Sequence, residues 1–158
     1  ELYDVLPFGN KVATMRLSGE QLMRLLAHGA RGSHGLLQVS CVRLRIDARR
    51  LRCGDGSHLL SATLESGEAI HPDGAYLVAT SDYLAQGGSG WTFLTNALGD
   101  GAVEILPTTL RKVTEDHLRR LADAQGGRID SERHPLVDPQ RPRVTTLHAG
   151  EERPCPKP

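Results

Sequence analysis

Short strand-like and helix-like segments alternate along the chain without a regular strand–helix–strand repeat. Turn-forming sequences such as Ser66-Gly67 and Pro72-Asp73-Gly74 separate neighbouring segments. The segments with a pattern typical of strands are 2–8, 11–17, 36–46, 58–65, 75–80 and 144–147. This order predicts an α+β fold in which a mixed or antiparallel sheet packs with a few helices.

A capping motif marks the start of the first helix. Ser18 and Gln21 have the spacing of a capping box, in which each side chain bonds the other residue's backbone N–H. The apolar residues that follow recur at helical intervals and form one stripe that faces the core: Leu22, Leu25, Leu26 and Gly29. Gly29 and Gly32 are the expected stop signals.

A second long helix is predicted over 115–125. Thr114 is its expected N-cap, Leu118 and Leu121 face inward, and Gly126-Gly127 ends it. A shorter helix is expected over 91–98.

The charge balance narrows the range of partners. Lys and Arg together number 19, as do Asp and Glu, so the formal net charge is zero. A domain that coats DNA or RNA needs an excess of basic residues, so no nucleic acid polymer is expected as a partner. No stretch approaches the ~18 consecutive apolar residues of a spanning helix, so no membrane span is expected.

The length of 158 residues favours one domain, which we place at 1–148. Residues 149–158 are rich in proline, lack apolar periodicity and are predicted to form a disordered tail. The chain begins without Met, inside a strand-like pattern and without a basic-then-apolar leader. We therefore expect it to be a fragment or a processed product.

The three cysteines, Cys41, Cys53 and Cys155, cannot all pair within one chain. The spacing of Cys41 and Cys53 suits neighbouring strands, so a bridge between them is one alternative. Two unpaired thiols are the alternative that we favour. No Cys-x-x-Cys or Cys-x-x-His pair is present, which argues against a cysteine metal site.

No catalytic constellation is visible in the sequence. The seven His do not have the spacing of metal ligands, and surface or capping roles are expected for His28, His34, His71 and His117. Gly88-Ser89-Gly90 lacks the flanking pattern of a nucleophile elbow. No Lys-Ser/Thr pair follows the glycines, so neither a phosphate loop nor a dinucleotide fingerprint fits. We predict no catalytic or metal-binding residue in this chain.

Two segments could bind a ligand. In Leu6-Pro7-Phe8-Gly9-Asn10 a phenylalanine follows a proline that restricts the backbone, and the Asn amide can both donate and accept hydrogen bonds. In the second segment Tyr83 precedes Gly87-Gly88-Ser89-Gly90, where glycines allow positive φ or a close approach to a ligand. Taken singly, a phenylalanine is usually a core residue and a glycine-rich turn is usually only a turn.

The order and spacing of five blocks make a stronger signal. They are Leu-Pro-Phe-Gly-Asn at 6–10, the strand that follows it, Leu-Ser-Gly-Glu-Gln-Leu at 17–22, Gly-Leu-Leu-Gln-Val-Ser at 35–40, and Asp-Gly-Ala-Tyr-Leu-Val-Ala-Thr-Ser-Asp-Tyr-Leu-Ala-Gln-Gly-Gly-Ser-Gly at 73–90. This series resembles the C-terminal domain of the 5′-nucleotidase family, over residues 2 to about 125 and the strand at 144–147.

The resemblance implies an enzyme in two parts. In this family a calcineurin-like metallophosphatase domain with two divalent metal ions precedes the C-terminal domain, and a metal-bound water or hydroxide attacks the phosphate ester there. The C-terminal domain grips the nucleoside. The implied partners are a nucleotide or nucleoside substrate and that N-terminal domain, which this chain lacks. No cofactor is implied for this domain itself, which we expect to be inactive alone.

The resemblance also implies a binding site. Phe8 and Tyr83 occupy the positions of two aromatic residues that sandwich the base, and Asn10 matches a residue that bonds the base edge. Gly35 matches a glycine that lines the pocket. Ser89 stands where the family usually has an Asp that binds the ribose hydroxyls, so contact with the sugar is expected to be weaker.

The function expected from these residues is recognition of the nucleoside of a nucleotide whose 5′-phosphate is hydrolysed by a secreted 5′-nucleotidase-like phosphohydrolase. The alternative is a non-catalytic surface or binding module that kept the fold and lost nucleotides. Ser89 favours that alternative, whereas Phe8, Asn10 and Tyr83 favour recognition. The family's usual export places the chain in the periplasm, at the cell surface or outside the cell.

Overall fold

The computed structural model describes residues 2–31, 36–51, 53, 55–96, 98, 101–130, 132, 138 and 140–147. The expected tail at 149–158 and Gly35 lie outside the described residues. The chain divides into two compact units. The first unit comprises Glu1–Arg16 and Leu77–Pro139, and the second comprises Leu17–Tyr76 and Gln140–Pro158.

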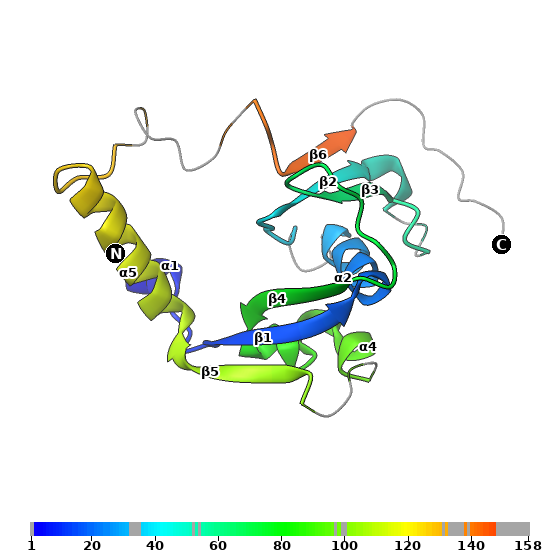
Figure 1. The fold of residues 1–158 in the computed structure, drawn as a ribbon, viewed down its shortest axis with the longest axis horizontal. Coiled ribbons are helices and arrows are strands. Elements are labelled where there is room, and N and C mark those ends of the chain that lie inside the picture. The colour runs from blue at the N-terminus through cyan, green and yellow to red at the C-terminus, as the bar shows by residue number, and fades with distance from the viewer. Residues whose placement is uncertain are drawn as a thin grey trace. The chain divides into compact units, whose positions relative to one another are not determined.

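A three-stranded sheet forms the centre of the first unit. Strand β1 (Lys11–Ser18) lies between β4 (Ala75–Ser81) and β5 (Val103–Thr109), as Figure 1 shows. β5 runs antiparallel to β1, with Ala13 opposite Ile105. Ala13 and Met15 are fully buried, as expected when alternate residues of a central strand face the core.

The sequence analysis missed β5. Its apolar alternation is interrupted by Glu104 and by Pro107, a residue that lacks the N–H a central strand needs. β5 is an edge strand of its sheet, so Pro107 is tolerated there. Strands β1 and β4 agree with the predicted strands over 11–17 and 75–80.

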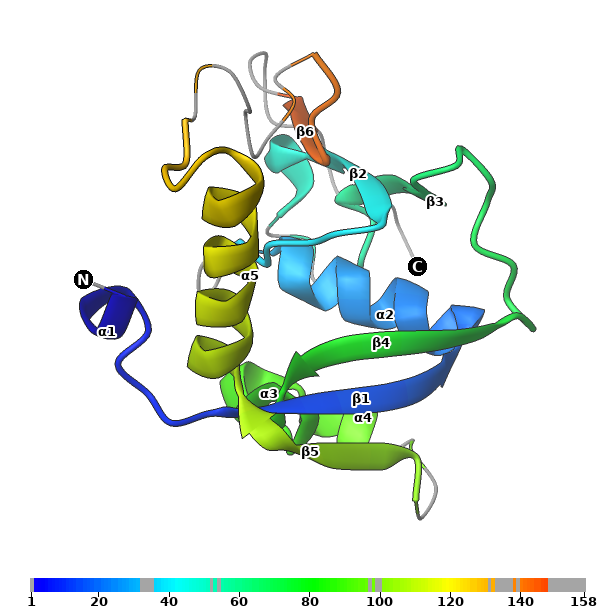
Figure 2. The same cartoon turned by 60° about the vertical axis from the view of Figure 1, so that its left-hand side comes forward.

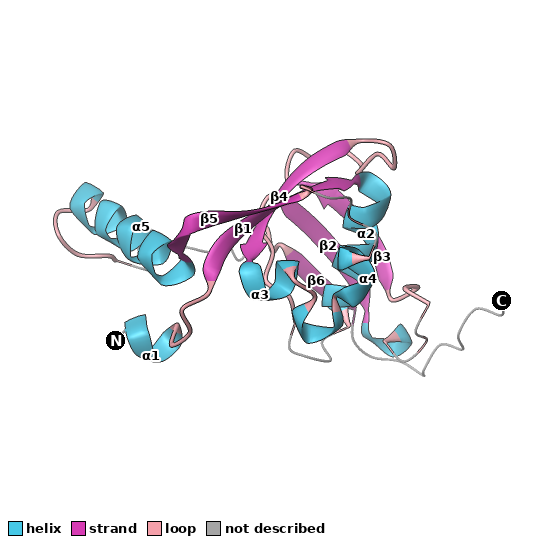
Figure 3. Cartoon of the chain, turned by 90° about the horizontal axis from the view of Figure 1, so that it is seen from below, coloured by secondary structure: helices cyan, strands magenta, loops and turns pink. Residues whose placement is uncertain are grey.

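Four α-helices and one 3₁₀-helix belong to the described part of the first unit: α1 (Leu2–Val5), α3 (Asp82–Ala85), η2 (Gly88–Gly90), α4 (Thr92–Thr95) and α5 (Leu110–Ala124). α3 and α4 lie on one face of the sheet (Figures 2 and 3). Trp91, which joins η2 to α4, is buried. The strand predicted over 2–8 is wrong, because the Leu6 N–H donates to the Leu2 carbonyl and closes a short helix instead.

α5 begins earlier than predicted. Thr109, the last residue of β5, accepts the Lys112 N–H at 3.2 Å and is the N-cap. Thr114 lies inside the helix, where its hydroxyl donates to the Leu110 carbonyl at 2.8 Å. The predicted stop is confirmed: Gly126 and Gly127 have positive φ, and the Gly127 N–H reaches the Ala122 carbonyl at 2.7 Å.

The second unit contains a mixed sheet and a long helix. The order of strands is β3 (Leu59–Leu64), β2 (Val42–Asp47) and β6 (Val144–Leu147), with β2 antiparallel to β3 and parallel to β6. Helix α2 (Gly19–Ala30) contacts β3, and the 3₁₀-helix η1 (Ala48–Arg50) follows β2. The α+β fold predicted from the sequence is therefore confirmed.

The strand predicted over 36–46 is only partly present. The described residues 36–39 have no regular structure, and β2 begins at Val42, where the apolar and charged residues start to alternate. Leu37 packs against Gly29 instead, since a Cβ added at Gly29 would lie 2.6 Å from Leu37 Cδ2. Contact with the helix thus explains the apolar character of this segment.

The N-terminus of α2 is held by its own cap and by a turn. Gln21 N–H donates to Ser18 Oγ at 3.2 Å and Ser18 N–H donates to Gln21 Oε1 at 2.8 Å, which confirms the capping box. The Gly19 N–H donates to the Gly74 carbonyl at 3.0 Å and the Glu20 N–H to the Pro72 carbonyl at 3.1 Å. Backbone donors that a helix end normally leaves to water are therefore satisfied.

We predict that Gly19→Ala destabilises the protein, although Ala normally favours a helix over Gly by about 1 kcal/mol. A Cβ at position 19 would lie 1.9 Å from the His71 carbonyl oxygen, so the turn would have to move. The expected loss is about 1–3 kcal/mol in the free energy of unfolding, measured by urea titration. Gly9→Ala, where no atom lies within 4 Å of the added Cβ, is the control. A gain in stability for Gly19→Ala would contradict this account.

Candidate functional site

The two segments singled out in the sequence meet through one side-chain hydrogen bond in the first unit. Asn10, which directly precedes β1, donates from Nδ2 to Oδ1 of Asp82 at 3.2 Å. Asp82 directly follows β4, the strand next to β1 in the sheet. Adjacent strands therefore bring Asn10 beside the residue that precedes Tyr83.

Asp82 is an ionised acceptor. Its partial burial alone would raise its pKa. Hydrogen bonds from the Asn10 amide and from the backbone N–H groups of Lys11 and Tyr83, together with the charge of Lys11, outweigh this effect and hold the pKa of Asp82 below its ordinary value. The Tyr83 N–H donates to Oδ1 at 2.8 Å. Asp82 was not predicted as a site residue, because its partner is distant in the chain.

Arg111 fixes the backbone on either side of Phe8. Its guanidinium donates to three successive carbonyls, those of Leu6 at 2.8 Å, Pro7 at 2.9 Å and Phe8 at 3.1 Å. The guanidinium also lies 4.3 Å from the centroid of the Tyr3 ring, within cation–π range. No local sequence pattern indicates this role, because it depends on where α5 begins.

The glycine-rich turn supports the Tyr83 ring. A Cβ at Gly88 would lie 2.5 Å from Cε1 and Cζ of Tyr83, so the ring packs directly on this glycine. The Tyr83 hydroxyl accepts the Ser89 N–H at 3.3 Å. Gly87, Ser89 and Gly90 all have positive φ, so the turn needs residues that tolerate the left-handed region. Tyr83 and Ser89 are thus parts of one local arrangement.

Both expected ring positions are exposed. Phe8 is 75% exposed and Tyr83 is 55% exposed, so neither ring belongs to the core. The structure connects Asn10, Tyr83 and Ser89 through hydrogen bonds, and ties Phe8 to α5 through its backbone. Gly35 lies outside the described residues, so its expected place at the pocket stays a prediction.

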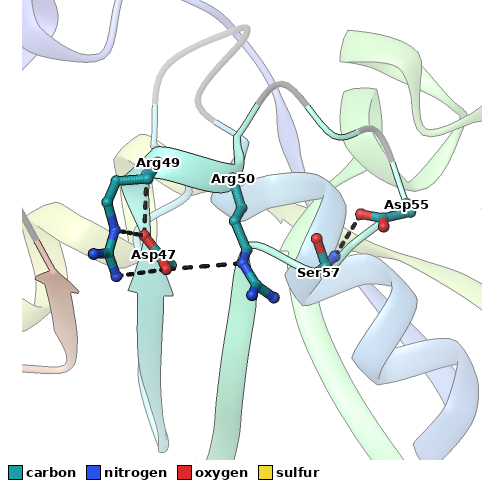
Figure 4. Close-up of polar contacts among 5 residues, drawn as sticks. All are labelled: Asp47, Arg49, Arg50, Asp55 and Ser57. Atoms are coloured by element: carbon teal, nitrogen blue, oxygen red, sulfur yellow. Dashed lines mark hydrogen bonds and ion pairs between the residues drawn. The ribbon is translucent and has the colours of Figure 1, made fainter. Parts of the chain in front are cut away.

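The second unit holds a separate polar cluster around a fully buried carboxylate (Figure 4). Arg49 approaches Asp47 with two nitrogens, Nε at 2.7 Å from Oδ1 and Nη2 at 2.8 Å from Oδ2, and Arg50 Nε lies 3.9 Å from Oδ2. The hydrogen bond to Asp47 raises the pKa of Arg49. Asp47 also accepts the Arg49 N–H at 3.1 Å and so caps η1. These bonds give the cluster a structural role at the end of β2.

Two further polar residues of the second unit lie near this cluster in sequence. Asp55 accepts the backbone N–H of Ser57 at 2.9 Å, and this hydrogen bond is the main cause that lowers the pKa of Asp55 (Figure 4). His58, which the sequence analysis did not single out, is fully buried, and its Nε2–H donates to the Ala27 carbonyl at 2.7 Å. Both groups hold the local backbone in place.

No group of three or more His, Cys, Asp or Glu that could hold a metal ion occurs among the described residues. In the same part of the chain, no helix is long and apolar enough to cross a membrane. Cys41 is an exposed free thiol, whereas Cys53 is in a disulfide. Cys41 and Cys53 are therefore not joined, and the favoured pair of unpaired thiols is wrong for Cys53.

We predict that Arg111→Lys loosens the segment around Phe8, because a lysine ammonium cannot reproduce the planar fork that reaches three carbonyls. The expected result is a loss of about 1 kcal/mol in the free energy of unfolding and lower NMR order parameters for the Phe8 and Gly9 amides. Arg119→Lys is the matched control, because Arg119 is exposed on the same helix and forms an ion pair with Glu115. Equal order parameters in both variants would contradict the role of Arg111.

Comparisons with known proteins agree on one family. Residues 1–96 match the family described as 5'-nucleotidase, C-terminal domain. The chain is 31% identical over 108 residues to an apyrase from Tabanus yao, covering 60% of this chain and 19% of the apyrase. It is 29% identical over 126 residues to the trifunctional nucleotide phosphoesterase of Bacillus subtilis, covering 72% of this chain and 8% of that protein.

A solved structure shows the same fold. The crystal structure of a 5'-nucleotidase precursor from Thermus thermophilus superposes with a TM-score of 0.74 at 23% identity, over 94% of this chain and 27% of that chain. This chain therefore spans less than a third of the length of each relative. Because the family match covers residues 1–96, more than half of the chain, the chain belongs to the 5'-nucleotidase family and carries its C-terminal domain.

Proposed function

We propose that the site of the first unit binds the nucleoside part of a nucleotide. In this proposal the Phe8 and Tyr83 rings flank the base, Asn10 bonds the base edge, and Ser89 contacts the ribose. The observation that carries the proposal is the Asn10–Asp82 hydrogen bond, because it brings together the two segments that bear the exposed rings. Aromatic faces bind any base by stacking, at about 1–3 kcal/mol per contact.

The way the rings are supported favours a binding role. Leaving an aromatic side chain in water forgoes the free energy of burying it. The Arg111 guanidinium nevertheless bonds the backbone carbonyls of the Phe8 segment, and the Ser89 N–H bonds the Tyr83 hydroxyl. A pre-organised pair of rings loses little conformational entropy when a planar ligand enters. Both rings are therefore exposed on supported segments, as a stacking site requires.

The hydrolytic step is assigned to the preceding domain that the family carries, which supplies two divalent metal ions. This chain's described residues contain no ligand cluster that fits such ions. We therefore propose substrate recognition as its role within a 5′-nucleotidase-like phosphohydrolase. The family's usual export further suggests a periplasmic, cell-surface or extracellular location.

A non-catalytic binding module is the second candidate. Ser89 stands in place of the family's usual Asp, and a hydroxyl lacks the charge and the second oxygen with which a carboxylate binds a ribose diol. This one substitution favours a module that kept the fold and lost nucleotides. Binding of a nucleotide to the chain distinguishes substrate recognition from such a module.

We predict that the 158-residue chain binds adenosine 5′-monophosphate and that Phe8→Ala and Tyr83→Ala each weaken binding roughly 5- to 100-fold, because each removes one stacking face. Chemical-shift titration by NMR measures the dissociation constants. Val5→Ala is the control, because Val5 is also 75% exposed but lies on α1. Wild-type binding that neither ring substitution weakens would rule out stacking of the base between Phe8 and Tyr83, and an absence of binding would favour the non-catalytic module.

We predict that the chain alone releases no phosphate from adenosine 5′-monophosphate, with or without added Mg²⁺, Mn²⁺ or Zn²⁺. The reason is the lack of a ligand cluster among the described His and carboxylate residues. A phosphate-release assay on highly purified chain measures this. Metal-dependent turnover that is abolished by a His or Asp substitution within the chain would show that the prediction is wrong.

A further inference from the structure

We infer that Asp82 fixes the orientation of the Asn10 amide, so that the site presents a carbonyl oxygen to the base and selects bases through an N–H donor. This inference rests on the proposed function and names a positioning residue and a substrate preference for the same site. It concerns atoms that the hydrogen-bond geometry assigns, namely Nδ2 and Oδ1 of Asn10 and Oδ1 of Asp82.

The direction of the Asn10–Asp82 hydrogen bond follows from the charge of the carboxylate. An ionised carboxylate has no hydrogen to donate, and the pKa of Asp82 lies below its ordinary value, so at neutral pH this side chain can only accept. The Tyr83 N–H donates to the same carboxylate at 2.8 Å and helps to keep it in place. Only the NH₂ side of the Asn10 amide can therefore face Asp82.

The carbonyl oxygen of the Asn10 amide is the group left to contact a ligand. With Nδ2 turned toward Asp82, the planar amide directs Oδ1 away from it. Among the described residues, no hydrogen bond to Asn10 Oδ1 is formed, and the side chain is half-buried. A flipped amide would place Oδ1 against the carboxylate, where two acceptors repel each other. The group that Asn10 offers to a ligand is therefore an acceptor.

A base that carries an N–H donor is the ligand that matches this acceptor. An acceptor on the protein recognises an N–H donor on the base, and in an adenine nucleotide the exocyclic 6-amino group is the only N–H of the base. Purine riboside 5′-monophosphate has hydrogen at this position and is otherwise the same molecule. Both nucleotides carry a purine base that can stack between the two rings. A difference between their affinities therefore measures the contact with the Asn10 amide.

The experiment compares these two nucleotides by NMR titration of the 158-residue chain. We expect the wild type to bind adenosine 5′-monophosphate about 5- to 10-fold more tightly than purine riboside 5′-monophosphate. Asp82→Asn should reduce this ratio to about 1, since a neutral amide at position 82 can bond either orientation of Asn10. Asn10→Ala should also reduce the ratio to about 1, and it keeps the test usable where Asp82→Asn disturbs folding.

Asp116→Asn is the matched control, because Asp116 also has a lowered pKa but pairs with Lys112 on α5. It should keep the wild-type ratio. Equal affinities of wild type for both nucleotides, combined with weaker binding of both in Phe8→Ala, would overturn the orientation of Asn10 and leave the proposed function standing. If Asp82→Asn and Asn10→Ala both kept the wild-type ratio of affinities for the two nucleotides, the proposed orientation of Asn10 would also be overturned. Failure of wild type to bind either nucleotide would overturn the proposed function and this inference together.

Discussion

The hydrogen bond from the Asn10 amide to the Asp82 carboxylate joins two segments that lie 72 positions apart in the sequence. It forms at the end of the sheet where the chain enters β1 and leaves β4, so the pairing of these two strands makes it possible. Phe8 lies two residues before this bond and Tyr83 one residue after it. The Asn10–Asp82 hydrogen bond, in which neither ring takes part, therefore joins the two segments that carry the rings.

Each ring has its own support behind this bond. Next to Phe8, the Arg111 guanidinium donates hydrogen bonds to three carbonyls of the Leu6–Phe8 segment. The Leu110 N–H also donates to the Asn10 carbonyl at 2.9 Å. On the other side, Tyr83 rests on Gly88, where a side chain would clash with the ring. These contacts hold the two segments without burying the rings. Both rings can therefore remain exposed.

Local signals in the sequence predicted the parts of the fold that depend on neighbours in the chain. The capping box of Ser18 and Gln21, the alternation from Val42 onward and the glycine stop after α5 were all predicted and are confirmed. β5 was missed because Pro107 is unusual inside a strand and is tolerated here only at an edge. The start of α5 was then placed too late, because its N-cap is the last residue of β5.

The candidate site was only partly predictable for a related reason. Phe8, Asn10, Tyr83 and Ser89 were found through a resemblance, which recognises residues in sequence order. Asp82 and Arg111 act through long-range contacts that a single sequence does not show. The disulfide of Cys53 was missed as well, because spacing along the chain suggested only a bridge to Cys41.

The central claim is that a nucleoside base lies between the Phe8 and Tyr83 rings. Intermolecular nuclear Overhauser effects between adenosine and the chain test it most directly, because they require protons within about 5 Å of each other. The account predicts contacts from the base protons H2 or H8 to ring protons of both Phe8 and Tyr83 in one complex. Contacts to neither ring, or to residues of the second unit such as those around Asp47, would contradict it.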